Sequence, residues 1–131
     1  MNGRWFLFVL LGAAALLMPS CGASSQLVSI SLIPASVDFQ GVGAQIQFKA
    51  IGTYIHPPVT RDITSLVQWS SNSSDVAIIT SGGLATGTNI CGSAEILATW
   101  YSNPGSPSKG TTIVATAQVV DGINNGICQQ Q

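Results

Sequence analysis

The stretch that decides the fold is GSAEILATW, residues 92–100. Apolar and polar side chains alternate along it, so that one face carries Ala94, Ile96, Ala98 and Trp100. A period of two is typical of a half-buried β-strand, whereas the apolar positions of a helix recur about every 3.6 residues. The stretch therefore predicts a strand with one face in the core.

Working outward, the same alternation recurs in short segments separated by turn signals such as Pro34 and Gly82-Gly83. The predicted strands are residues 28–32, 46–50, 67–71, 76–80, 84–86, 92–100 and 113–119. After the N-terminal apolar run, no stretch has helical periodicity. About seven short strands with regularly spaced turns predict an all-β protein, a β-sandwich of Greek-key type.

Several of these segments carry motifs in a defined order: VSISLIP (28–34), IQFKAIGTY (46–54), DIT (62–64), VQWSS (67–71), VAII (76–79), GLATG (83–87) and GSAEILAT (92–99). In order and spacing they resemble the bacterial immunoglobulin-like domain, group 2. The resemblance implies an immunoglobulin-like β-sandwich of about seven strands, of the kind found in surface adhesins and envelope proteins. The chain departs from the family at residues 54–58 and in a long loop at 102–110.

A role in the fold is enough to explain why each of the motif residues is present. Trp69 is expected to fill the core, because an indole at a strand centre buries a large apolar area. Asp62 and Thr64 are expected to bond local backbone N–H groups where the chain crosses between the sheets. Gly83 is expected where a side chain would block the backbone.

The N-terminus indicates export. Arg4 precedes an apolar run of about fourteen residues, 5–18, which suits a secretory signal and is too short to span a bilayer. The run ends at Ser20 and Cys21, and a small residue before a cysteine resembles the lipobox of bacterial lipoproteins. The prediction is acylation of Cys21 and anchoring in the cell envelope. The alternative is cleavage after Ala23 and plain secretion.

These features predict a signal peptide at residues 1–20, a linker at 21–26, the β-sandwich domain at 27–121 and a C-terminal tail at 122–131. Gly22 after the lipidated cysteine favours the outer membrane if the source is Gram-negative, by resemblance to lipoproteins of such bacteria.

Lipidation or cleavage removes Cys21 from the cysteine count and leaves Cys91 and Cys128 as a pair. In an oxidising compartment such a pair favours a disulfide, although two free thiols are the alternative. If the last hairpin pairs Tyr101 with Thr111, Cys91 faces roughly Asp121, and a turn in the tail would bring Cys128 back to it.

The chemical inventory disfavours an enzyme. The five acidic residues are scattered, and His56, the only histidine, stands beside Pro57, so no acid–base pair or Ser/His/Asp arrangement is indicated. No cofactor is expected. No metal site is predicted; calcium at Asn72 and Asp75 is the alternative, although one carboxylate there is few for the about six to eight oxygen ligands that calcium takes. A net charge of −1 with 7% charged residues makes nucleic acid a poor partner.

The remaining prediction concerns a binding tip. In immunoglobulin-like sandwiches the two departing segments would lie at one end, which groups aromatic and proline side chains: Tyr54, Ile55, His56, Pro57, Pro58, Tyr101, Asn103 and Pro104. The predicted function is adhesion to, or interaction with, an envelope protein or carbohydrate. The alternatives are that these prolines and tyrosines only finish the fold, and that the protein is a structural spacer or accessory subunit of an envelope assembly.

Overall fold

The computed structural model describes residues 24–122. Within them the strands are β1 (Gln26–Ile33), β2 (Ser36–Gln40), β3 (Gln45–Gln47), β4 (Lys49–Ile55), β5 (Val59–Asp62), β6 (Gln68–Ser71), β7 (Ala77–Ile79), β8 (Leu84–Gly87), β9 (Gly92–Tyr101) and β10 (Thr112–Gly122). A single 3₁₀ turn, η1 (Pro107–Lys109), lies between the last two strands. None of these residues forms a helix that is long and apolar enough to cross a membrane.

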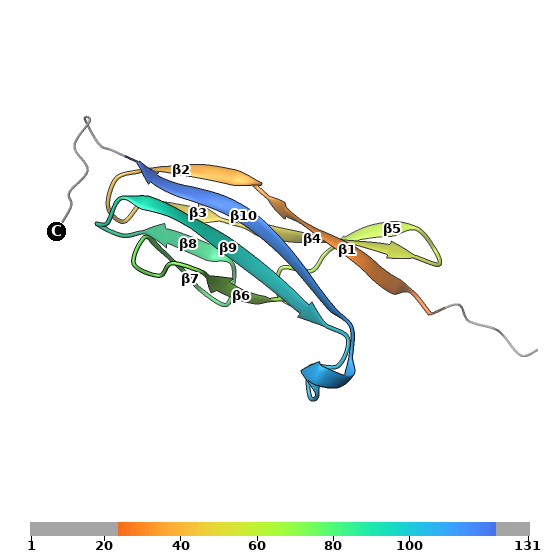
Figure 1. Ribbon diagram of the computed structural model, residues 1–131. Coiled ribbons are helices and arrows are strands. Elements are labelled where there is room, and N and C mark those ends of the chain that lie inside the picture. Colours follow the sequence, from red (N-terminus) through yellow and green to blue (C-terminus); the bar gives the residue numbers. More distant parts are fainter. Residues whose placement is uncertain (1–23, 123–131) are drawn as a thin grey trace, which may run out of the picture.

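The strands form two layers (Figure 1). One layer has the order β2-β10-β9-β6, and the other consists of β1-β4-β5 and β3-β8-β7. Strands β3 and β4 are separated only by Phe48, whose N–H donates to the carbonyl of Gly83 at 2.8 Å, so they act as one interrupted strand that joins these two parts. The protein is therefore an all-β, immunoglobulin-like sandwich, as predicted.

Two strands, β2 and β5, were absent from the prediction. The chain leaves the first layer after β1, and β2 pairs in parallel with β10 in the other layer, starting at Ser36 opposite Gln118. The chain crosses to the other layer at Pro34, which has no backbone N–H with which to continue the hydrogen bonds between β1 and β4. Only Val37 and Phe39 alternate inward in β2, too short a pattern to stand out. Strand β5 returns along β4 as a short hairpin.

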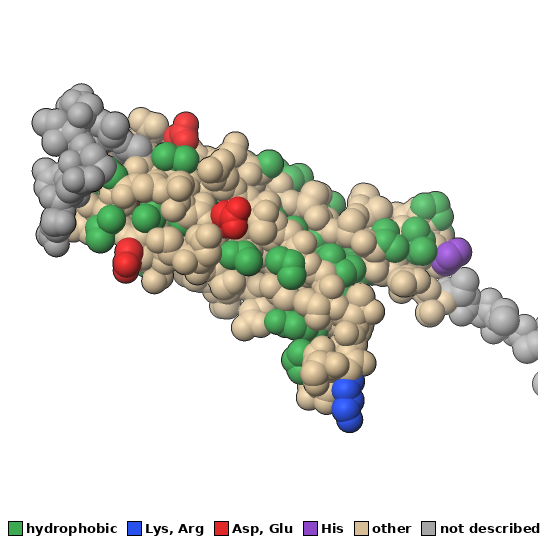
Figure 2. Space-filling model, in the orientation of Figure 1, with side chains coloured by type: hydrophobic (Ala, Val, Ile, Leu, Met, Phe, Trp, Pro, Cys, Tyr) green, Lys and Arg blue, Asp and Glu red, His purple; other side chains and the backbone are tan. Residues whose placement is uncertain are grey.

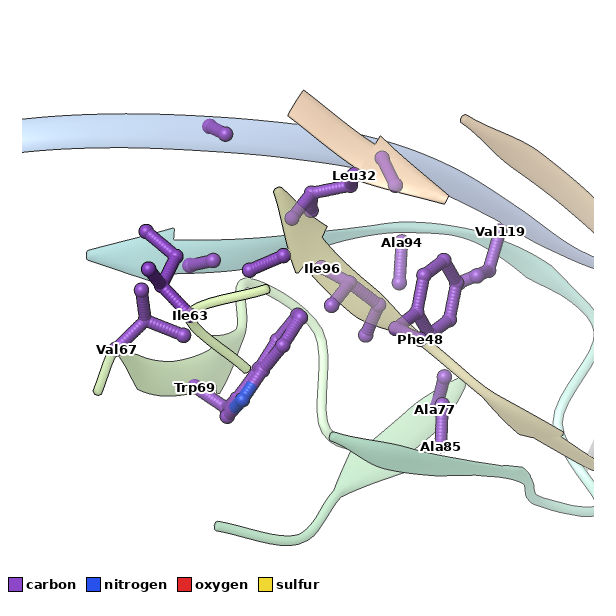
Figure 3. Packing of buried hydrophobic residues seen from close by; sticks show 14 of the residues in the cluster. Leu32, Phe48, Ile63, Val67, Trp69, Ala77, Ala85, Ala94, Ile96 and Val119 are labelled. Carbon is purple, nitrogen blue, oxygen red and sulfur yellow. The ribbon is translucent and has the colours of Figure 1, made fainter. Parts of the chain in front are cut away.

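The core lies between the layers and confirms the predicted alternation (Figure 3). The inward side chains of β9 and β10 are mostly small, namely Ala94, Ile96, Ala98, Ala115, Ala117 and Val119. Small residues on this layer leave room for Phe48 and Trp69, whose ring centroids lie 6.4 Å apart. Trp69 is buried, as predicted from its place at a strand centre.

The register of the last hairpin differs from the expected one by one residue. Tyr101 pairs with Thr112 and not with Thr111, and Gly92 faces Asp121. Thr111 remains in the connection, where its carbonyl accepts the N–H of Ser102 at 2.9 Å. This places Cys91 one position beyond the pair that the sequence suggested.

Candidate interaction site

The β4–β5 turn forms the tip of one end of the sandwich. The last pair of the hairpin is Tyr54 opposite Val59, so four residues make the turn. His56 has a φ of +60°, a backbone conformation that non-glycine residues adopt mainly in turns. His56, Pro57 and Pro58 are exposed and Ile55 is half-buried. The turn therefore presents a short surface of apolar and ring side chains.

Tyr54 lies just behind this tip and is half-buried. The guanidinium carbon of Arg61 lies 5.3 Å from the centre of its ring, a cation–π distance. Gly52 makes the close packing here feasible, because a Cβ at that position would come within 2.7 Å of a Leu27 methyl and 2.9 Å of an Ile63 methyl. Tyr54 thus contributes to the core as well as to the surface.

A pocket of about 300 Å³, the end pocket, opens between the two layers at this end. Its walls come from the start of β1, from β4 and from the β9–β10 hairpin: Ser24, Ser25, Gln26, Leu27, Tyr54, Trp100, Ser102 and Thr111. The N-terminal end of the described chain therefore lies beside the two segments that depart from the resembled family.

The β9–β10 loop is ordered by local hydrogen bonds. The hydroxyl of Ser102 accepts the N–H of Thr111 at 2.8 Å, and further along the N–H of Ser106 donates to the carbonyl of Asn103 at 3.1 Å. Gly110 is required where the loop closes, because a Cβ there would lie 2.5 Å from the Ser102 hydroxyl. The loop thereby holds Pro104 and Pro107 in place.

A second pocket of about 320 Å³, the side pocket, lies between this loop and the outer face of β6 and β9. Its lining consists of Ser65, Leu66, Val67, Gln68, Thr99, Tyr101, Pro104 and Pro107. Leu66 is 63% exposed and Tyr101 is half-buried. An exposed leucine, a tyrosine ring and two prolines beside amide and hydroxyl groups form a surface suited to contact with another molecule.

The predicted tip is thus divided between two places. Its two segments do lie at one end, but Tyr54 lines the end pocket and Tyr101 lines the side pocket. The reason is the alternation of β9, which turns Trp100 toward Tyr54 and the next residue to the opposite face. Ile55, His56, Pro57 and Asn103 line neither pocket.

The sequence interpretation omitted Trp100 and Leu66 from the site. The alternation of β9 predicts Trp100 on the core face of its strand, and only its place at the strand end exposes it to the end pocket. Leu66 gave a weak signal as a lone apolar residue between Ser65 and the strand that follows. Its exposure depends on how the corner after β5 folds.

That corner confirms the predicted bond of Asp62 to a local backbone N–H, whereas the backbone partner of Thr64 is Ala50, 14 residues away in sequence. A carboxylate oxygen of Asp62 accepts the N–H of Thr64 at 2.9 Å and its hydroxyl at 2.6 Å. The same hydroxyl oxygen accepts the N–H of Ala50 at 3.0 Å, and the Thr64 carbonyl accepts the indole N–H of Trp69 at 3.0 Å. The hydroxyl and backbone N–H bonds from Thr64 lower the pKa of Asp62.

Asp121 is the only buried charged residue among those described, at 6% exposure. Its Oδ2 has no hydrogen-bond partner, and it lies where a Cβ on Gly87 would be only 3.0 Å away. Burial raises the pKa of the Asp121 carboxyl. The charged carboxylate of Asp121 is therefore expected to lower the stability of the fold, because it is buried and one of its oxygens lacks a hydrogen-bond partner.

The predicted lipidation and disulfide sites lie partly outside the residues that the structure describes. Cys91 directly precedes β9, but Cys21 and Cys128 lie outside the described residues, so the lipidation and the disulfide remain predictions. Residues 24–122 hold no group of three or more His, Cys, Asp or Glu side chains placed to bind a metal. The side-chain oxygen of Asn72 accepts the N–H of Glu95 at 2.8 Å, so it is already engaged in docking the turn onto β9.

Comparison with known proteins gives one clear match. No family model matches the chain. Over 86 residues, 66% of the chain, it is 38% identical to ice-binding protein 1 of Shewanella frigidimarina. The chain spans only 9% of the length of that protein. The likeness is therefore to a small piece of a much longer protein.

Proposed function

We propose that the protein is a non-enzymatic lipoprotein of the cell envelope, anchored through Cys21, whose immunoglobulin-like domain is an adhesion or interaction module for a protein or carbohydrate. The side pocket is the observation that carries the proposal. It places Tyr101, Leu66 and prolines on one accessible surface, and rigid rings of this kind contribute contact area at low entropic cost.

The sequence motifs support assignment of the domain to the bacterial immunoglobulin-like group 2. The match to a short piece of a long protein supports use of such a unit as a module within larger proteins. The rim of the side pocket is neutral, since none of its lining residues is charged. We therefore expect binding that changes little with salt concentration.

The test is capture of envelope components by the purified mature protein, with mild cross-linking. We expect the double variant Leu66→Ser and Tyr101→Ser to lose capture of the partner. The matched control is Ile78→Ser, which removes an apolar side chain that is 52% exposed on the outer face of the other layer. Equal capture by both variants would exclude the side pocket as the contact, and absence of capture by the unaltered protein would support the structural spacer instead.

Ice binding is a second candidate, suggested by the name of the matched protein. The outer face of β6, β9 and β10 carries uncharged side chains in register where Thr99 lies between Gln68 and Val114, and Glu95 is a charged residue on the same face of β9. Thermal hysteresis of the purified domain tests this candidate. A freezing point equal to the melting point would exclude it.

A further inference from the structure

The position of the proposed anchor fixes which end of the domain faces the membrane. Cys21 is three residues before Ser24, the first described residue. A fully extended chain spans at most about 3.6 Å per residue, so Ser24 lies within about 11 Å of the lipidated cysteine. Ser24 and Ser25 line the end pocket beside Tyr54. The β4–β5 turn is therefore held near the bilayer surface.

The chemistry of this turn suits an interface with lipid headgroups. Pro57 and Pro58 are exposed and Ile55 is half-buried, so apolar surface stands at the outermost point. Arg61 lies close behind with its guanidinium on the Tyr54 ring. An amphipathic ring with a cation is the combination found at the headgroup level of membranes.

Charge is distributed unevenly along the described domain. On the hairpin that forms the tip, Arg61 reaches the Tyr54 ring, whereas the carboxylate of its neighbour Asp62 bonds Thr64 in the corner after β5. Lys109 is in the β9–β10 loop, and Asp38 and Glu95 belong to the opposite half of the β2-β10-β9-β6 layer. On the face that Figure 2 shows, the visible acidic side chains lie away from the end that carries the histidine. A cation near an anionic membrane favours contact by roughly fivefold.

We propose that the β4–β5 turn, residues 55–58, lies against the anionic lipid surface of the membrane that holds the anchor. The proposal rests on the lipidated Cys21 of the proposed function. Its consequence is that this turn is not the partner-binding tip. The side pocket, on the outer face of its sheet, and the end of the domain that carries Val42 and Ile90 remain open to a partner.

The test uses the lipidated mature protein in nanodiscs with anionic lipids and a paramagnetic gadolinium headgroup. Intact mass first establishes acylation of Cys21, so failure of the anchor is distinguished from failure of the orientation. We then compare the methyl NMR signals of Ile55 and Ile90. Ile90 is 38% exposed and precedes β9, whose ten residues extend roughly 30 Å toward the other end.

We expect the Ile55 signal to be lost and the Ile90 signal to be retained. Equal attenuation, or loss of Ile90 alone, would overturn the proposal. The double variant Arg61→Gln and Lys109→Gln should restore part of the Ile55 signal, while Lys49→Gln, a cation on β4 away from the tip, should not. No change in the double variant would refute attraction by anionic headgroups.

Discussion

At the scale of single residues, Thr64 connects three parts of the molecule. Its hydroxyl joins Asp62 to the backbone of Ala50, and its carbonyl receives the indole of Trp69. The corner after β5 therefore fixes the crossing between the layers through the side chain and the carbonyl of one residue. This explains in physical terms why the short motif DIT precedes the core tryptophan.

Thr64→Val should lower the free energy of unfolding by about 1 to 3 kcal/mol, because the N–H of Ala50 loses its acceptor. Thr60→Val, on exposed β5, is the matched control and should change it little. Urea unfolding measures both. Similar values for the two variants would contradict the role of the corner.

The same corner predicts a response to acid. The pKa of Asp62 is lowered from 3.8 in the folded state, so its contribution to stability is present above about pH 3.8 and is lost as pH falls through the folded pKa. Thr64→Val should reduce this acid sensitivity, since the hydroxyl bond to the carboxylate is lost and only the backbone N–H of residue 64 still donates to it. The slope of unfolding free energy against pH below 4 measures the difference.

Asp121 predicts the opposite dependence. Burial raises its pKa above 3.8, so its protonated form favours folding below that pH and this advantage is lost as pH rises through the folded pKa. Asp121→Asn should therefore raise the melting temperature at pH 7 and flatten its fall above pH 4. Asp38→Asn, an exposed site, controls for the change in net charge. A lower melting temperature for Asp121→Asn would refute the interpretation.

At the scale of elements, the β7–β8 hairpin depends on the glycine that the sequence singled out. Gly83 has a φ of +82°, and a Cβ there would lie 2.9 Å from the carbonyl oxygen of Phe48. The carbonyl of Gly83 also accepts the N–H of Phe48, where β3 passes into β4. The turn of one hairpin thus fixes the interruption of its neighbouring strand.

Gly83→Ala should destabilise the protein by about 1 to 3 kcal/mol through the strained φ and the close contact. Gly82→Ala is the matched control, because the nearest atom to its Cβ would be a Thr80 hydroxyl at 3.9 Å. Thermal unfolding of both variants tests the pair. Equal melting temperatures would show that the backbone there can adjust.

At the scale of the whole molecule, the proposed anchor at Cys21 predicts where the domain acts. The mature protein should lack residues 1–20 and carry acyl chains on Cys21, because two or more chains give stable attachment. Intact mass of protein extracted from the envelope measures this. An unmodified N-terminus at Ser24 would contradict the lipoprotein interpretation, and Cys21→Ala should abolish membrane retention.

The sequence by itself determined the strand type, the inward faces of β9 and β10, the core position of Trp69 and the bond of Asp62 to the nearby backbone N–H of Thr64. These features are local, since alternation and side-chain bonds to nearby backbone act over a few residues. The pattern in 92–100 therefore sufficed to place Ala94, Ile96 and Ala98 in the core.

Only the tertiary structure decided the layer of β2, the register of Tyr101 with Thr112 and the separation of Tyr54 from Tyr101. These depend on pairing between distant segments, where a shift of one residue reverses the face of each side chain. The exposure of Leu66 and Trp100 follows from the same pairing, because a strand end is buried or open according to the segments that pass beside it.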